Sequence, residues 1–169
     1  MAKTKLKGND VNLAGNDVKV GDKAPEVTVV GKDLSEIKVG GAKDKVQLIV
    51  AVPSLDTAVC AAETRKFNEE ASAIEGVEVT VVSMDLPFAM GRFCTTEGID
   101  NLTVGSDFRN KDFAKSYGVL IADGPLAGVS ARAIFVVNNS GEITYKQIVP
   151  EITEEPDYKE AIEAAKAAI

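Results

Sequence analysis

The chain has 169 residues, 45% hydrophobic and 27% charged, and this composition predicts one compact domain, residues 1–169, with a sizeable core. Its 26 acidic and 19 basic residues give a formal net charge of −7, which disfavours nucleic acid and anionic membranes as partners. Because there is no histidine, Ser-His, Cys-His and His-metal mechanisms are excluded, and two cysteines are too few for a four-thiolate zinc site. We therefore expect thiol or acid-base chemistry.

The N-terminal part of the sequence is predicted to form short strands, and no membrane-spanning segment is expected. Its basic residues are not followed by an apolar leader, and no later stretch is long enough to span a membrane, so we expect a cytoplasmic protein. Residues 4–13 predict a hairpin that turns at Gly8-Asn9. Residues 26–30 and 37–39 are predicted to form short strands, and the apolar run 46–52 predicts a central strand covered on both faces.

A helix is predicted from residue 57 to about residue 74, and a cysteine lies in its first turn. Thr57 is the expected N-cap, which makes Cys60 the third helical residue. The unpaired N–H groups and the helix dipole stabilise negative charge there, and the thiolate is the nucleophilic form of cysteine. In a reducing compartment such a cysteine is catalytic, redox-sensing or simply a buried apolar side chain, and the local pattern leaves these readings open.

The second half predicts alternating strands and helices. After Gly76 the valine-rich residues 77–84 indicate a buried strand. Pro87 then suits the first turn of a short helix, capped by Asp85 or its neighbour, and this helix carries Cys94. The later elements are a strand at 103–106, a helix at 110–117, a loop at 119–129, a hairpin formed by 131–138 and 142–149, and an amphipathic helix from Pro156.

This order of elements predicts an α/β fold. Strands alternate with helices in the middle and are followed by a hairpin and a final helix. The arrangement is the plan of the thioredoxin fold, with a mixed central sheet, helices on both faces and an additional N-terminal β-hairpin.

Two cysteine-centred runs resemble a known family. The run Pro53-Ser-Leu-Asp-Thr-Ala-Val-Cys60 and the run Asp85-Leu-Pro-Phe-Ala-Met-Gly-Arg-Phe-Cys94 are similar to the bacterial thiol peroxidase subfamily of the peroxiredoxins, of the atypical two-cysteine type. Shorter likenesses at 61–68, 108–110, 117–126 and 131–133 extend the resemblance from about residue 6 to the C-terminus.

The resemblance implies a role for each of four residues. Cys60 matches the cysteine that attacks a hydroperoxide and becomes a sulfenic acid. Thr57 matches the hydroxyl that holds the thiolate and the peroxide, and Pro53 the ring that shields them from water. Arg132 matches the arginine that stabilises the thiolate and the developing charge, a task that suits a permanently charged group with several fixed donors.

The resemblance also implies a complete catalytic cycle. Cys94 matches the resolving cysteine, which forms an intramolecular disulfide with Cys60. The substrates are then hydrogen peroxide and organic hydroperoxides, and thioredoxin is the implied electron donor. The family also implies a homodimer, with residues 126–128 as a candidate contact, and no prosthetic group.

Several alternatives stay open on the residues alone. Arg132 lies in an apolar strand, but strand alternation could turn it outward. Phe88, Met90 and Phe93 line a substrate pocket or, as the commoner outcome, pack in the core. The same two cysteines would also serve a redox sensor, a chaperone-like binding module or a structural disulfide. Both cysteines lie in predicted helices, and thiols on separate helices are usually too far apart to form a disulfide. We therefore expect the helix start at residue 57 or the segment 87–97 to unwind when the disulfide forms.

Overall fold

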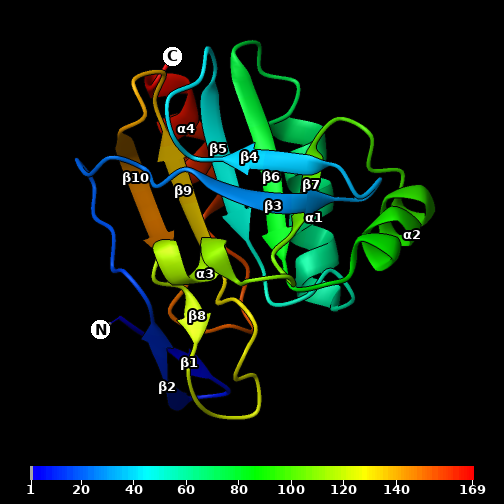
Figure 1. Cartoon of the computed structure of the whole chain (residues 1–169), viewed down its shortest axis with the longest axis vertical. Coiled ribbons are helices and arrows are strands. Elements are labelled where there is room, and N and C mark those ends of the chain that lie inside the picture. Colours follow the sequence, from blue (N-terminus) through cyan, green and yellow to red (C-terminus); the bar gives the residue numbers. More distant parts are fainter. Residues whose placement is uncertain (1) are drawn as a thin grey trace.

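The computed structural model describes residues 2–169 and contains two sheets and several helices (Figure 1). The strands are β1 (Lys3–Leu6), β2 (Asn9–Ala14), β3 (Val27–Gly31), β4 (Glu36–Val39), β5 (Val46–Ala51), β6 (Val77–Ser83), β7 (Thr103–Ser106), β8 (Leu120–Ile121), β9 (Ala133–Val137) and β10 (Ile143–Ile148). The helices are α1 (Ala58–Glu70), α2 (Pro87–Glu97), α3 (Asp112–Ser116) and α4 (Tyr158–Ala167). The larger sheet has the order β10-β9-β5-β6-β7-β3-β4, and the smaller one the order β1-β2-β8.

Strand β5 is an interior strand of the larger sheet and is buried along its whole length. It pairs in parallel with β6 and antiparallel with β9, so the sheet is mixed. Leu48 and Val50 face one hydrophobic cluster, whereas Ile49 and Ala51 face the other. A strand covered on both sides accounts for the continuous apolar run in the sequence.

Helices cover both faces of this sheet, as predicted. Phe67 of α1 and Ala165 of α4 belong to the cluster on one face. Phe113 and Tyr117, at α3, stack at 4.6 Å between ring centroids within the cluster on the other face. The α/β fold with a mixed sheet, flanking helices and an N-terminal hairpin is therefore confirmed (Figure 1). None of the helices in the described part of the chain is long and apolar enough to cross a membrane.

The structure corrects the boundaries of three predicted helices. The helix expected at 110–117 is α3, which spans only Asp112–Ser116. Helix α1 ends at Glu70 rather than near residue 74, because the Ser72 N–H donates to Phe67 O five residues back and widens the last turn. Ile74 still packs against the same cluster, which explains why the apolar spacing continued past the helix. The last helix begins two residues after Pro156, where Asp157 caps it by accepting a hydrogen bond from Glu160 N at 3.0 Å.

Two further differences concern the smaller sheet. The first hairpin turns at Lys7 and Gly8, one residue earlier than predicted, and both have positive φ (50° and 83°) as a two-residue turn of this hand requires. The predicted loop 119–129 contains β8, which pairs with β2. A strand of two residues is too short to show a periodic pattern in the sequence.

Candidate active site

The turn between β5 and α1 places a thiol at a helix N-terminus. Thr57 is the N-cap, and its Oγ1 accepts a hydrogen bond from Cys60 N at 3.3 Å and donates one to Ser54 O at 3.2 Å. Cys60 is the third helical residue, as predicted, and is 0% exposed. Pro53, which opens the turn, is also buried. The sulfur is therefore shielded from bulk water beside the unpaired N–H groups of the first turn.

Arg132 reaches the same thiol from the far end of the sequence. The register of β9 against β5 pairs Ala133 with Ala51, which brings Arg132 to the end of β5. The side chain turns inward and is 2% exposed, so the alternative of a surface arginine is excluded. Its Nη1 donates to Cys60 Sγ at 3.1 Å, and its Nε donates to Ile152 O at 3.0 Å. A guanidinium at this distance favours the anionic form of a thiol.

Glu63 completes the cluster and was not singled out from the sequence. It lies one turn after Cys60, is 0% exposed, and accepts a hydrogen bond from Arg132 Nη1 through Oε2 at 3.0 Å. Burial raises the pKa of Glu63 to about 7, although Arg132 acts in the opposite direction. Burial alone would lower the pKa of Arg132, but Cys60 and Glu63 outweigh it, so the pKa of the guanidinium is raised. The spacing of three residues from Cys60 on one helix is the sequence feature that could have indicated Glu63.

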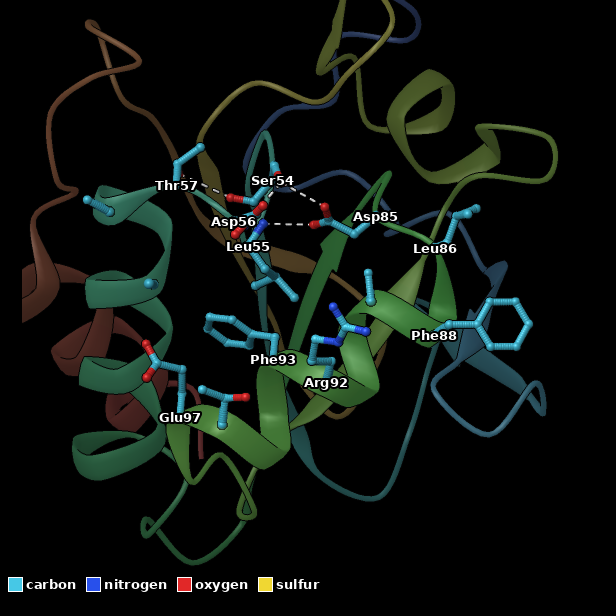
Figure 2. Close-up of a pocket in the computed structure, with 14 residues that line it drawn as sticks. Ser54, Leu55, Asp56, Thr57, Asp85, Leu86, Phe88, Arg92, Phe93 and Glu97 are labelled. Atoms are coloured by element: carbon cyan, nitrogen blue, oxygen red, sulfur yellow. Dashed lines mark hydrogen bonds between the residues drawn. The ribbon is translucent and has the colours of Figure 1, made fainter.

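Asp85 fixes the turn that carries Thr57. This carboxylate accepts hydrogen bonds from Ser54 Oγ and Leu55 N, both at 2.7 Å (Figure 2). It accepts a third from Ser83 Oγ at 2.6 Å. The N-cap position of α2 is taken by the neighbour of Asp85, Leu86, whose side chain makes no capping hydrogen bond. Asp85 therefore ties the end of β6 to the turn after β5.

Cys94 lies on α2 and is almost as well buried as Cys60. Both cysteines are free thiols, and both side chains belong to the same hydrophobic cluster. Burial raises the pKa of the Cys94 thiol, and the charge of Lys32 opposes this shift. A buried neutral thiol is a weak nucleophile, so Cys94 must change its surroundings before it reacts.

An open cavity of about 790 Å³ lies between the start of α1 and α2 (Figure 2). Thr57 is in its wall, together with Phe88 and Phe93, whereas Met90 is fully buried in the core. From the sequence, these three apolar residues could line a pocket or pack in the core. In the structure, two of them line the cavity and one packs in the core. In Figure 2 Phe93 points toward α1, while the ring of Phe88 points away from it and is largely exposed. Arg92 gives the wall one positive charge.

The five residues expected at the site fall into two groups. Cys60 contacts both Thr57 and Arg132 at the start of α1, and Pro53 is buried in the turn that leads to it. Cys94 lies on α2 within the same hydrophobic cluster as Cys60. Within residues 2–169 no three His, Cys, Asp or Glu side chains are placed to hold a metal ion. Fold and site together define a class, a thioredoxin-fold protein whose buried thiol is held against an arginine at a helix N-terminus.

Comparisons with known proteins agree with this class. The redoxin family matches residues 19–162. A thiol peroxidase from Aquifex aeolicus is 59% identical over 170 residues and one from Leptospira interrogans 56% over 171, each covering all of both chains. The crystal structure of a peroxiredoxin-like protein from Aquifex aeolicus superposes with a TM-score of 0.97 at 57% identity, covering 100% of this chain and 98% of that one. The chain belongs to the bacterial thiol peroxidases, a subfamily of the peroxiredoxins, and the resemblance seen in its two cysteine-centred runs is confirmed.

Proposed function

We propose that this chain reduces hydrogen peroxide and organic hydroperoxides in a two-cysteine cycle in which Cys60 attacks the peroxide and Cys94 resolves the product. The observation that carries the proposal is the 3.1 Å contact between Arg132 Nη1 and Cys60 Sγ at the start of α1. A cation and a helix N-terminus both favour the thiolate, which is the attacking form. The relatives named thiol peroxidases support the same activity.

In the first step the Cys60 thiolate attacks the terminal peroxide oxygen. The S–O bond forms as the O–O bond breaks, the sulfur is oxidised by two electrons to a sulfenic acid, and the departing alkoxide takes up a proton. Arg132 and the first-turn N–H groups stabilise charge as it moves from sulfur to oxygen. The hydroxyl of Thr57, in the wall of the cavity, orients the peroxide, and Pro53 limits access of water. The apolar part of the cavity wall, which includes Leu55, Phe88 and Phe93, favours organic hydroperoxides.

In the second step the Cys94 thiol attacks the sulfenic acid, a disulfide forms, and water leaves. Both sulfurs are buried on different helices, so we infer that α2 unwinds locally. Two features of α2 support this inference: its N-cap has no side-chain hydrogen bond, and its interior contains Gly91, which costs about 1 kcal/mol relative to alanine.

The test follows the thiols and the turnover in two cysteine variants. Cys60→Ser is expected to lose peroxide reduction, and a variant that still turned over would exclude Cys60 as the attacking thiol. Cys94→Ser is expected to be oxidised once per chain and then to stop, because no disulfide is available for the reductant. Sustained turnover of the wild type distinguishes a peroxidase from a redox sensor, which oxidises once.

The partners and cellular setting are also proposals. Two cysteines supply no second dithiol within the chain, so we infer reduction by thioredoxin, and replacing it by glutaredoxin in coupled assays should abolish turnover. A thioredoxin-linked cycle suits a reducing cytoplasm, which supports that location.

We further propose a homodimer, tested by sedimentation, and one domain spanning residues 1–169, tested by a single cooperative unfolding transition. The shared larger sheet supports the single domain.

A further inference from the structure

Three ionisable side chains are sealed together at the start of α1. Arg132 Nη1 contacts both Cys60 Sγ at 3.1 Å and Glu63 Oε2 at 3.0 Å. Glu63 has no exposed surface, and its Oε1 has no hydrogen-bond partner within residues 2–169. The cluster therefore contains two acids, one cation and one unsatisfied carboxyl oxygen.

The charge of this cluster limits which protons it can lose. If Cys60 and Glu63 were both ionised, the buried group would carry a net charge of −1, whereas one retained proton gives a net charge of zero. Burial penalises net charge, so the site is most stable with one proton shared between the two acids.

The surroundings decide which acid keeps the proton. Cys60 lies at the helix N-terminus, where the dipole stabilises a negative charge. Glu63 carries an oxygen without a donor, which costs more for a charged group than for a neutral one. Glu155 lies just before α4, and its negative charge also disfavours ionisation of Glu63. Tyr158, the first residue of α4, donates its hydroxyl to Glu155 rather than to Glu63.

We propose that Glu63 is the proton partner of Cys60: it carries a proton while Cys60 is a thiolate and releases that proton as Cys60 is oxidised. This inference rests on the proposed role of Cys60 as the attacking thiol. Glu63 acts through Arg132 and does not touch the peroxide, so it is a positioning residue. Its pKa, which burial raises to about 7, lies where a proton can be gained and lost near neutral pH.

The proposed step is balanced in atoms, electrons and charge. The Cys60 thiolate gains an oxygen and a hydrogen from the hydroperoxide, the O–O bond breaks, and two electrons pass from sulfur to the peroxide. The alkoxide takes up one proton while Glu63 releases one. Cys60 changes from −1 to 0 and Glu63 from 0 to −1, and Arg132 stays positive. The buried site is neutral before and after the reaction.

The test is a proton count during a single oxidation. The reduced protein is mixed with one equivalent of cumene hydroperoxide in weakly buffered solution with a pH indicator. Proton uptake is divided by the amount of Cys60 oxidised, measured by peptide mass, and compared with the thiolate fraction from ultraviolet absorbance. For the wild type near pH 7 we expect a substantial thiolate fraction but almost no net uptake. For Glu63→Gln we expect uptake equal to the thiolate fraction, approaching one proton.

Controls separate this role from a structural one. Glu69→Gln removes an exposed carboxylate from the same helix and should match the wild type. Uptake equal to the thiolate fraction in the wild type, or the same count in the wild type and Glu63→Gln, would overturn the inference. If Glu63→Gln does not fold, the wild-type comparison of uptake with thiolate still decides. If Cys60 is not oxidised at all, the proposed function fails first, and that result is read from the peptide mass alone.

Discussion

Replacement of Asp85 by alanine tests whether this carboxylate holds the active-site turn. Asp85 accepts three hydrogen bonds, two of them from the turn itself at Ser54 and Leu55. A hydrogen bond to a charged acceptor contributes about 1.5–3 kcal/mol when buried. Because Asp85 is partly exposed, we use about 1 kcal/mol for each, which predicts a loss of about 2–3 kcal/mol in the free energy of unfolding. For a chain of this length that loss lowers Tm by roughly 5–10 °C.

The same change should slow the peroxide step. The turn that Asp85 holds carries Thr57, which positions Cys60, and small displacements of reacting groups reduce rates by one to two powers of ten. We therefore expect the rate constant for oxidation of Cys60 by cumene hydroperoxide, measured by stopped flow, to fall ~10-fold or more. Urea unfolding gives the stability change on the same sample.

Asp56→Ala is the matched control. This carboxylate lies in the same turn and lines the same cavity, but it is exposed and accepts no hydrogen bond within the described residues. Its removal changes the local charge as Asp85→Ala does, so both stability and rate should stay close to the wild type. If the two variants behave alike, the three hydrogen bonds of Asp85 do not organise the site.

Three other perturbations address different parts of the molecule. Arg132→Lys cannot reproduce the fixed fork of donors, so the peroxide step should slow ~100-fold in stopped flow; a smaller change than 3-fold would contradict the assigned contact. Glu97→Gln removes the partly exposed ion pair with Arg65 (2.5 Å) that joins α1 to α2. This change should speed disulfide formation while lowering the free energy of unfolding by less than about 1 kcal/mol. An unchanged rate of disulfide formation argues against unwinding of α2. Burial raises the pKa of Glu63 from 4.5 to about 7, so the native state holds this proton more tightly than the unfolded chain and the free energy of unfolding falls as pH rises across that range. One pKa unit corresponds to about 1.4 kcal/mol, so between these pH values the free energy of unfolding of the wild type should fall by roughly 3 kcal/mol more than that of Glu63→Gln, measured by urea titration. Parallel pH profiles of the two proteins would refute the buried-proton assignment.

Local chemistry made part of the site predictable. The capping preference of Thr57 and the count to Cys60 depend on four consecutive residues, and the structure places both as the sequence indicated. The apolar run of β5 likewise reports burial on both faces without any knowledge of its partners. These features follow from backbone geometry over one turn or one strand.

The roles of the other site residues depend on contacts between residues far apart in the sequence, which the sequence alone does not reveal. Arg132 and Cys60 are 72 positions apart, so the residues alone could not choose between an inward and an outward arginine. Asp85 was expected near a helix cap, because the sequence gives no sign of the turn 30 positions earlier that it binds. Glu63 looks like an ordinary helix residue until the arginine beside it is known. Each of these side chains acquires its role from sheet register and chain crossing.

The complete burial of Cys60 has a consequence for chemical probes. A reagent can reach the sulfur only if it is narrow enough to pass the wall formed by residues such as Thr57 and Ala61, or if the helix opens first. Bulky maleimides and fluorophores should therefore label the native protein at the rate at which this region opens. Covalent inhibitors of such an enzyme would need small, slender warheads, and slow labelling by larger ones would serve as a clock for the opening motion.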